Sequence, residues 1–534
     1  LKDKERVMQK IFYNGTIITM EKSLYAEAVL INDGVIEDVG SFDALHALAP
    51  SAELVDLAHK AMLPAFIDAH GHFSSYANAQ MQVVLEEADS FSEIALRITS
   101  FIKDNKIESG KWIVAKGYDH NTLAEKRHPN IELLNEIAPD NPLILQHQSG
   151  HCGVLNTAAL ESLGINCDTP SPAGGVIGRE NGKLTGYMEE DAYISCIKQV
   201  PMAGIDAMLG AYAKAQAKYL ANGITTVQEG MMVAEMLPLY SFLIESGILK
   251  IDVVGYPDTN SMQAIAKAYP ACVKKYSKHF KIGGYKIILD GSPQVKTAWM
   301  KTPYLNSDTL GYGTMSDEAV LLAVENAAKE NMQILAHCNG DAAIQQYINA
   351  VKEVAFTDDN ILKLRPVIIH SQLITEDELK DAAALNMIPS FFVAHVLHWG
   401  DIHIANFGYE RAKHISPAHS AIKNNMIFTF HQDAPVIEPN NLETIQCAVT
   451  RKTKSGVSLG EDECISVEDA IRAVTINAAY QYSEENEKGS IKAGKHADFV
   501  IMDKSPLAVP KNEISKILIT ETIKDGITVF ALNE

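Results

Sequence analysis

The sequence is poor in positive charge and has neither long apolar runs nor paired cysteines. Its 534 residues include 46 lysines and arginines against 67 aspartates and glutamates, a formal net charge of −21. Such an excess of negative charge argues against a nucleic-acid partner, because the phosphates would be repelled. No apolar run approaches the roughly 20 residues that a membrane span needs. We therefore expect neither nucleic acid nor membrane as a partner.

The cysteines indicate a reducing compartment. Seven cysteines are scattered without paired spacing, which is typical of reduced thiols rather than of a disulfide framework. The N-terminal stretch LKDKERVMQKIFYNG lacks the apolar core of a secretory signal, although a leader removed before residue 1 would leave no trace in this sequence. We therefore expect a cytoplasmic protein.

The length and the two ends of the chain predict a large domain and a smaller one. A chain of 534 residues is too long for one ordinary hydrophobic core. Both ends contain short strands broken by the turn dipeptides Asn14-Gly15, Asp33-Gly34 and Asp525-Gly526. We therefore predict a small β-sandwich domain assembled from residues 1–62 and 488–534.

Between these ends, short apolar strands alternate with helices. The strands include GITTVQEG, GGYKIILDGS, MQILAHCNG and RPVIIHSQL, and helices such as SDEAVLLAVENAAKE and TEDELKDAAALN each open with a Ser or Thr cap. This alternation implies a parallel sheet, and its length fits a closed (β/α)8 barrel of the TIM type. We therefore predict an α/β fold with a barrel over residues 63–487 and a rim insertion over about 74–221.

The stretch LPAFIDAHGHFSS contains the first candidate metal ligands. His70 and His72 follow an apolar strand and are two positions apart. In extended backbone, side chains two apart point to the same face, so both imidazoles would point to one place just beyond the strand. Two histidines do not complete a metal site, so further ligands must come from elsewhere in the chain.

Four later strands end in further candidate ligands. GGYKII, QILAH, PVIIH and IFTFHQD supply Lys286, His337, His370 and Asp433. Reacting groups of parallel barrels lie at the carboxyl ends of the strands. Taken singly, either histidine would more often be structural, and the aspartate could merely cap the next helix. Their occurrence together, on successive strands, favours a nitrogen and oxygen site for zinc or a similar divalent ion.

These motifs resemble those of the amidohydrolase superfamily, and within it the branch that includes the N-substituted formamide deformylases. The matching segments are PAFIDAHGH, SGHCGVLNTAAL, ANGITTVQEG, GGYKIILDGSPQVKTAWM, AHCNGDAAI, HSQLI, FTFHQDAPV and EKGSIKAGKHADFVIMD. They cover nearly the whole chain. SFFVAHVLHWGD, residues 390–401, resembles the formamide deformylase subgroup most closely.

The resemblance implies a set of metal ligands. The more buried ion would be held by His70, His72 and Asp433, and a second ion, where present, by His337 and His370. Lys286 matches the position at which many relatives carry a carboxylated lysine that bridges both ions. The alternative is an unmodified lysine beside a single ion, so the cofactor is one or two divalent ions, with zinc as the first expectation.

The implied reaction is hydrolysis of a C–N bond in a small amide or formamide by a metal-activated water. Asp433 would take the proton of that water and pass it to the departing amine. His395 or His151 would polarise the carbonyl, and the sequence does not choose between them. The segments GYDHNTL and SGHCG carry polar groups suited to a substrate-facing rim, or are ordinary loops.

Other functions remain open at this point. The same metal arrangement serves hydrolases of cyclic amides, carbamates and aminated rings. A non-catalytic regulatory protein is a further alternative, since some relatives carry labels that tie them to exoenzyme production, but the complete ligand set argues against loss of catalysis. Dimers are common among such relatives, so a homodimer is also an expectation.

Overall fold

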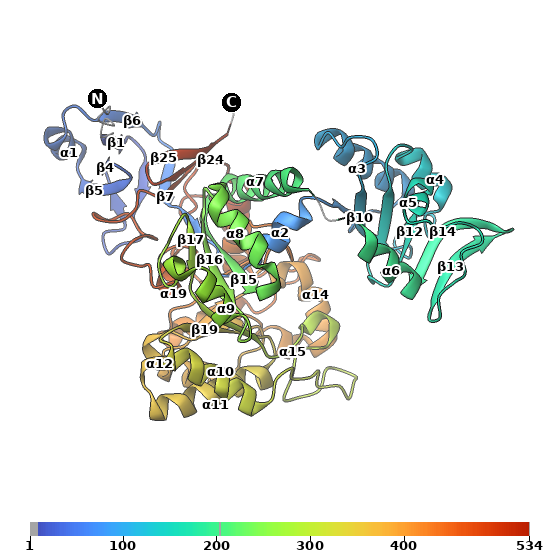
Figure 1. Ribbon diagram of the computed structural model, residues 1–534. Helices are drawn as coiled ribbons and strands as arrows, with labels where there is room; N and C mark the ends of the chain where they lie inside the picture. Colours follow the sequence, from blue (N-terminus) through green and yellow to red (C-terminus); the bar gives the residue numbers. More distant parts are fainter. Residues whose placement is uncertain (1–8, 202–203, 533–534) are drawn as a thin grey trace. The chain divides into compact units, whose positions relative to one another are not determined.

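The computed structural model describes residues 9–201 and 204–532 (Figure 1). The chain forms two compact units, one of Leu1–Phe73 with Gln216–Glu534 and the other of Ser74–Ala215. The outermost residues of the two terminal segments, 1–8 and 533–534, lie outside the described residues, and so does the start of the N-terminal stretch considered above.

Two parallel sheets form the centre of the first unit. The first has the order β17-β16-β15-β8 and the second the order β18-β19-β20-β21-β22. The strands are β8 (Phe66–Ile67), β15 (Ile224–Met232), β16 (Asp252–Pro257), β17 (Phe280–Ile282), β18 (Gly284–Ile288), β19 (Gln333–Cys338), β20 (Val367–His370), β21 (Ile388–Phe391) and β22 (Thr429–Phe430). Nearly all of their residues are buried, as expected for parallel strands covered on both faces.

Backbone contacts connect these two sheets at both margins. An isolated parallel bridge pairs Asp258, just after β16, with Lys286 in β18. At the other margin, the Asp433 N–H donates to the His70 carbonyl at 3.2 Å, and the His72 N–H donates to the Ala434 carbonyl at 2.8 Å. The segment after the last strand is thereby joined to the segment after the first.

Helices follow most of the parallel strands, as the sequence predicts, although only Gly283 lies between β17 and β18. They are α8 (Leu237–Ser246), α9 (Met262–Ala268), α10 (Asp317–Lys329), α11 (Asp341–Thr357), α12 (Asn360–Lys363), α13 (Glu376–Ala384), α14 (His395–Phe407), α15 (Tyr409–Ala412), α16 (Ala418–Lys423), α17 (Asn441–Thr450), α18 (Val467–Ala473) and α19 (Ile476–Gln481). The side chain of Ser316 caps α10 by accepting the Ala319 N–H. Thr375 and Glu378 form a reciprocal capping box at the start of α13.

Both termini contribute to the remaining sheets of the first unit. One has the order β5-β4-β1-β6 and the other β25-β24-β23-β7-β2-β3. The strands are β1 (Gln9–Tyr13), β2 (Thr16–Ile18), β3 (Tyr25–Ala26), β4 (Ala28–Asn32), β5 (Val35–Gly40), β6 (Glu53–Asp56), β7 (Ala61–Pro64), β23 (Phe499–Met502), β24 (Ile519–Lys524) and β25 (Ile527–Ala531), with helix α1 (Phe42–Leu48) before β6. Phe12, Val29 and Phe499 share one buried apolar cluster, so residues from the two ends form a common core.

A buried group of charges connects the terminal segments to the parallel strands. Asp252 of β16 lies 2.7 Å from the Lys488 ammonium and 2.8 Å from that of Lys524 in β24. Glu484 pairs with Lys488 at 3.1 Å and also with Lys281. Attraction to Lys488 and Lys524 outweighs burial and holds the pKa of Asp252 well below its ordinary value.

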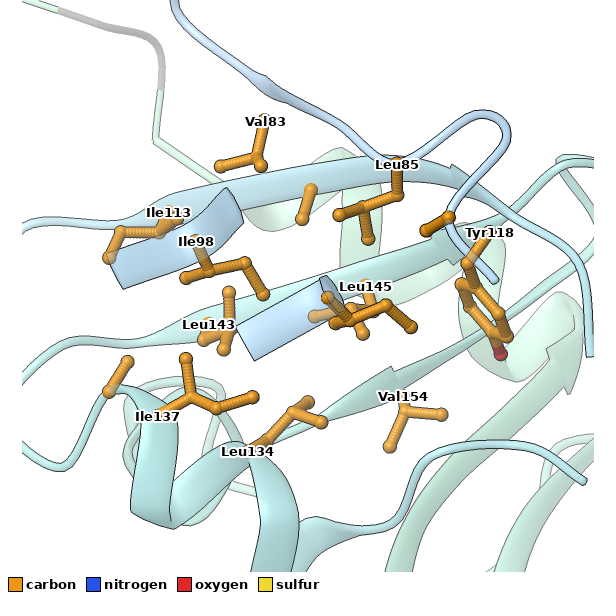
Figure 2. Packing of buried hydrophobic residues seen from close by; sticks show 14 of the residues in the cluster. Val83, Leu85, Ile98, Ile113, Tyr118, Leu134, Ile137, Leu143, Leu145 and Val154 are labelled. Atoms are coloured by element: carbon orange, nitrogen blue, oxygen red, sulfur yellow. The ribbon is translucent and has the colours of Figure 1, made fainter. Parts of the chain in front are cut away.

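The second unit is built on one mixed sheet with the order β13-β14-β12-β11-β10-β9. Its elements are α2 (Phe73–Ala79), β9 (Val83–Val84), α3 (Phe91–Asp104), β10 (Ile113–Tyr118), α4 (Ile131–Ile137), β11 (Leu143–His147), β12 (Cys152–Leu155), α5 (Thr157–Ser162), β13 (Gly175–Glu180), β14 (Lys183–Glu190) and α6 (Asp191–Gln199). Figure 2 shows its apolar core, where Val83, Ile113, Leu145 and Val154 lie on neighbouring strands. This unit ends at Ala215, within α7 (Ile205–Ala221).

The helices bear on whether the chain could span a membrane. In the part of the chain that the structure describes, no helix combines the length and the apolar character needed to cross a bilayer.

Candidate metal centre

The six predicted ligands lie at the carboxyl ends of the parallel strands in the first unit. His70 and His72 follow β8, and Asp433 follows β22. Lys286, His337 and His370 come from three successive paired strands, β18, β19 and β20. Because these strands are parallel and in register, residues far apart in the sequence meet at one edge.

The Asp433 carboxylate lies at the centre of three imidazoles. Its Oδ1 is 3.5 Å from His70 Nε2 and 3.4 Å from His72 Nε2, and its Oδ2 is 3.9 Å from His370 Nε2. Ligand atoms bound to one tetrahedral zinc ion at 2.0–2.1 Å lie roughly 3.3 Å from each other. Within the described residues, the buried Asp433 Oδ1 has no hydrogen-bond partner. The donor set therefore fits a divalent cation.

His337 lies beside a buried carboxylate. Its ring lies 4.5 Å from that of His370, centroid to centroid, and its Nδ1 is 3.2 Å from Asp290 Oδ1. Asp290 accepts the backbone N–H groups of Trp299 and Gly340 at 3.1 and 2.7 Å. The Asp290 carboxylate is therefore fixed by the backbone close to the His337 ring.

Lys286 is buried beside the first histidine. Its Nζ lies 3.2 Å from His70 Nε2. Burial lowers the pKa of Lys286 to about 8, although the nearby Asp433 carboxylate acts in the opposite direction. The lysine therefore lies within reach of the other ligands, as the sequence predicts.

Burial also sets the protonation of the other ligands. It holds the pKa values of His70 and His370 well below the usual range and lowers that of His72 to about 4. These imidazoles are thereby neutral near pH 7, which is the form that ligates metals. Burial raises the pKa of Asp433 to about 7, partly offset by Lys286, and a bound cation would favour the ionised carboxylate.

Two ligands adopt strained backbone conformations. His370 has φ 73° and Asp433 has φ 54°, both in the left-handed region that residues other than glycine seldom occupy. Each such residue costs on the order of 1–3 kcal/mol, and strain of this kind gathers at functional sites. Both conformations occur where the chain leaves a strand and the side chain enters the ligand cluster.

Two residues that hydrogen-bond the ligand imidazoles were missed by the sequence reasoning. Gln228 Oε1 lies 2.5 Å from His70 Nδ1, while its amide group donates to the Ala69 carbonyl and the Tyr482 hydroxyl at 3.0 Å each. The amide orientation makes Oε1 an acceptor, so His70 carries its proton on Nδ1 and presents Nε2 as a lone pair.

The second of these residues is His431. Its Nε2 lies 3.1 Å from His370 Nδ1, and its Nδ1 lies 3.0 Å from Ser390 Oγ. Like Gln228 at His70, it contacts the ring nitrogen that points away from Asp433, while the other nitrogen of that ring faces the carboxylate. His431 stands two positions before Asp433 in FTFHQD, so a same-face argument like that used for His70 and His72 could have found it.

The two histidines predicted to polarise the substrate carbonyl lie in different units. His395, the first residue of α14, is buried, and its ring lies 4.5 Å from that of Phe392, which in turn lies 6.3 Å from that of His370. His395 thus contacts Phe392, which in turn contacts the ligand His370. His151 belongs to the second unit, where its largely exposed imidazole lies 3.1 Å from Glu190. The structure brings together the six predicted ligands and leaves both of these roles untested.

Known proteins match this chain in sequence and in fold. The model of the amidohydrolase family matches residues 53–530. The chain belongs to the amidohydrolase family. This membership confirms the resemblance found in the sequence and classes the chain as a hydrolase.

Relatives within this family extend over almost the whole chain. The protein YtcJ of Bacillus subtilis (strain 168) is 27% identical over 543 aligned residues, which cover 98% of this chain and 99% of YtcJ. The N-substituted formamide deformylase of Arthrobacter pascens is also 27% identical, with coverage of 96% and 97%. This amidohydrolase and both relatives therefore align over nearly their full lengths.

Solved structures show the fold of this amidohydrolase. The crystal structure of an uncharacterized metal-dependent hydrolase from Pyrococcus horikoshii matches with a TM-score of 0.75 at 24% identity, covering 94% of this chain and 99% of that one. This likeness, together with the family, shows an α/β fold of the TIM-barrel type, as predicted from the alternation of strands and helices.

Proposed function

We propose that this amidohydrolase cleaves a C–N bond in a small amide, with an N-substituted formamide as the first substrate to test. The observation that carries the proposal is the convergence of three neutral imidazoles on the buried Asp433 carboxylate. The similarity to the Arthrobacter pascens deformylase supports the choice of substrate class. We also propose that the parallel strands form one closed barrel, that the terminal sheets form a small β-sandwich, and that the protein is a homodimer.

The proposed cofactor is one or two divalent ions, zinc first. His70, His72 and Asp433 would hold the more buried ion, and His337 and His370 the second. Bound there, a divalent ion would lower the pKa of a water and polarise a carbonyl oxygen. Nitrogen and carboxylate ligands of this kind suit zinc.

Asp433 is the proposed proton carrier. One carboxylate oxygen would accept the proton of the attacking water and donate it to the nitrogen of the departing amine. Its backbone N–H is held by the His70 carbonyl, and the strained φ directs the side chain to the centre of the imidazoles. His395 or His151 remains the proposed group that polarises the carbonyl.

Lys286 is proposed to carry a carboxyl group. A carbamate forms when the neutral amine adds carbon dioxide and releases a proton, and burial favours the neutral amine at this position. An ammonium cannot ligate a metal, whereas a carbamate presents two anionic oxygens beside His70. An intact-mass measurement under native conditions tests this, with an added carboxyl group expected and an unmodified lysine as the contrary result.

Replacement of Asp433 tests the proposed function. Asp433→Asn should keep the fold and reduce kcat by at least two orders of magnitude, because an amide cannot carry the proton. The matched control is Asp381→Asn, an exposed aspartate of α13 that should retain full turnover.

The assay is hydrolysis of a panel of formamides, cyclic amides, carbamates and aminated rings by protein of measured metal content. Turnover of a formamide by the parent protein and its loss in Asp433→Asn would support the proposal. Turnover only of another group in the panel would change the substrate class. A metal-loaded protein that hydrolyses no member of the panel would favour the non-catalytic regulatory alternative.

A further inference from the structure

Three metal-ligating side chains meet within the second unit, at the ends of two neighbouring parallel strands. Tyr118, the last residue of β10, is in register with His147, the last residue of β11. Asp119 and His120 directly follow β10. His147 Nε2 lies 3.2 Å from His120 Nδ1 and 3.5 Å from Asp119 Oδ1, and the latter two atoms are 3.8 Å apart.

These separations are those of atoms that share a metal ion. Two ligand atoms of a tetrahedral zinc ion at 2.0–2.1 Å lie roughly 3.3 Å apart. Two imidazole nitrogens and one carboxylate oxygen form a common zinc donor set, and three protein ligands leave one coordination position for water or another small ligand. Among the described residues, this trio and the set of His70, His370 and Asp433 are the groups whose donor atoms converge closely enough to hold an ion.

The carboxylate of this trio is held in place from two sides. Asp119 Oδ1 accepts the backbone N–H of Asn121 at 2.9 Å, and Oδ2 accepts the Gln148 amide at 2.5 Å. Its side chain is 16% exposed and that of His147 is 10% exposed. A carboxylate positioned before a ligand arrives loses little further freedom on binding, which favours affinity.

The imidazoles are also oriented by neighbours. His147 Nδ1 accepts the Ser149 backbone N–H at 3.1 Å and lies 2.9 Å from Ser149 Oγ, so the loop after β11 holds the orientation of this ring. The His120 ring stacks on His128 with centroids 4.0 Å apart.

We propose that Asp119, His120 and His147 form a second metal site, which lies within the second unit and takes zinc or a similar divalent ion. The bound ion would fasten the loop after β10 to the end of β11. The three ligands belong to the segments GYDHNTL and LILQHQSG. The proposal does not depend on the reaction that the first unit catalyses.

Zinc binding to the full chain tests the site. Protein stripped with a chelator is titrated with Zn²⁺ against a chromophoric competitor, and its metal content is measured by mass spectrometry. His147→Gln and Asp119→Asn should each bind one zinc ion fewer per chain than the parent. Ser149→Ala should bind this ion about 10–100-fold more weakly, because it removes the group that orients His147. His151→Gln, a neighbouring histidine outside the trio, should bind zinc as the parent does.

Two further measurements separate this site from the first one. The double variant His70→Asn/His72→Asn should lose zinc from the first unit and keep the ion bound by Asp119, His120 and His147. Zinc-soaked crystals of the parent protein should show an anomalous peak between the three donor atoms, a result that needs no substitution. Unchanged zinc stoichiometry in both His147→Gln and Asp119→Asn, or the absence of that peak, would overturn the proposal.

Discussion

At the scale of single residues, Gln228 decides which nitrogen of His70 is available to a cation. Gln228→Leu keeps the approximate volume but removes the acceptor at 2.5 Å from His70 Nδ1. We expect zinc to bind about 10–100-fold more weakly, because the tautomer and ring orientation are no longer held. Competition titration with Zn²⁺ measures the change, and Gln345→Leu on α11 is the control that should leave affinity unaltered. Equal affinity in Gln228→Leu and the parent would contradict this role.

The same scale shows how much of the site can be predicted. The six ligands were identifiable because each lies in or just after an apolar strand, and the carboxyl ends of parallel strands converge. Gln228 gave no such signal. It lies inside β15, a strand in which all residues but one are buried, and its contact with His70 joins residues 158 positions apart. Asp290 was missed for a related reason: it lies after β18 in an irregular segment, and only the folded chain brings it to His337.

At the scale of secondary structure, local signals placed the helices well. Thr375 accepts the Glu378 N–H, and Glu378 accepts the Thr375 N–H at 2.8 Å, which is the capping box expected from TEDELKDAAALN. Thr375→Ala should lower the free energy of unfolding by about 1 kcal/mol, whereas Thr375→Ser should retain most of it. Chemical denaturation measures both. A Thr375→Ser variant as unstable as Thr375→Ala would show that the hydroxyl is not the source of the effect.

Element boundaries were less predictable than element types. The strands that precede the first and last ligands, β8 and β22, are two residues long each, although both lie in longer apolar runs. Hydrophobicity predicts burial, but the extent of a strand depends on which neighbour offers backbone partners. The trio in the second unit illustrates the same limit, because its assembly depends on the register that pairs Tyr118 with His147.

At the scale of the first unit as a whole, a group of buried charges joins the terminal segments to the parallel strands. The turn dipeptides at both ends predicted a composite domain but gave no sign of this connection. Asp252 comes from β16, whereas Lys488 and Lys524 come from the C-terminal part of the chain. Asp252→Asn should lower the free energy of unfolding by about 3–5 kcal/mol, because two buried ammonium groups lose their counter-charge.

The same charges predict how stability depends on pH. The ordinary pKa values of Asp252 and Glu484 are 3.8 and 4.5, and in both cases attraction to neighbouring lysines outweighs burial and lowers the pKa in the folded protein. A carboxylate with a lowered folded pKa contributes stability that is complete above its unfolded pKa and is lost as the pH falls through the folded value. Unfolding of the parent should therefore become markedly easier below about pH 4.5.

Asp252→Asn should lose less of its free energy of unfolding between pH 6 and pH 3 than the parent does, because one of the two carboxylates no longer titrates. Urea denaturation at each pH measures this. Parallel curves for the two proteins would mean that the acid sensitivity arises elsewhere and that Asp252 remains paired regardless of pH.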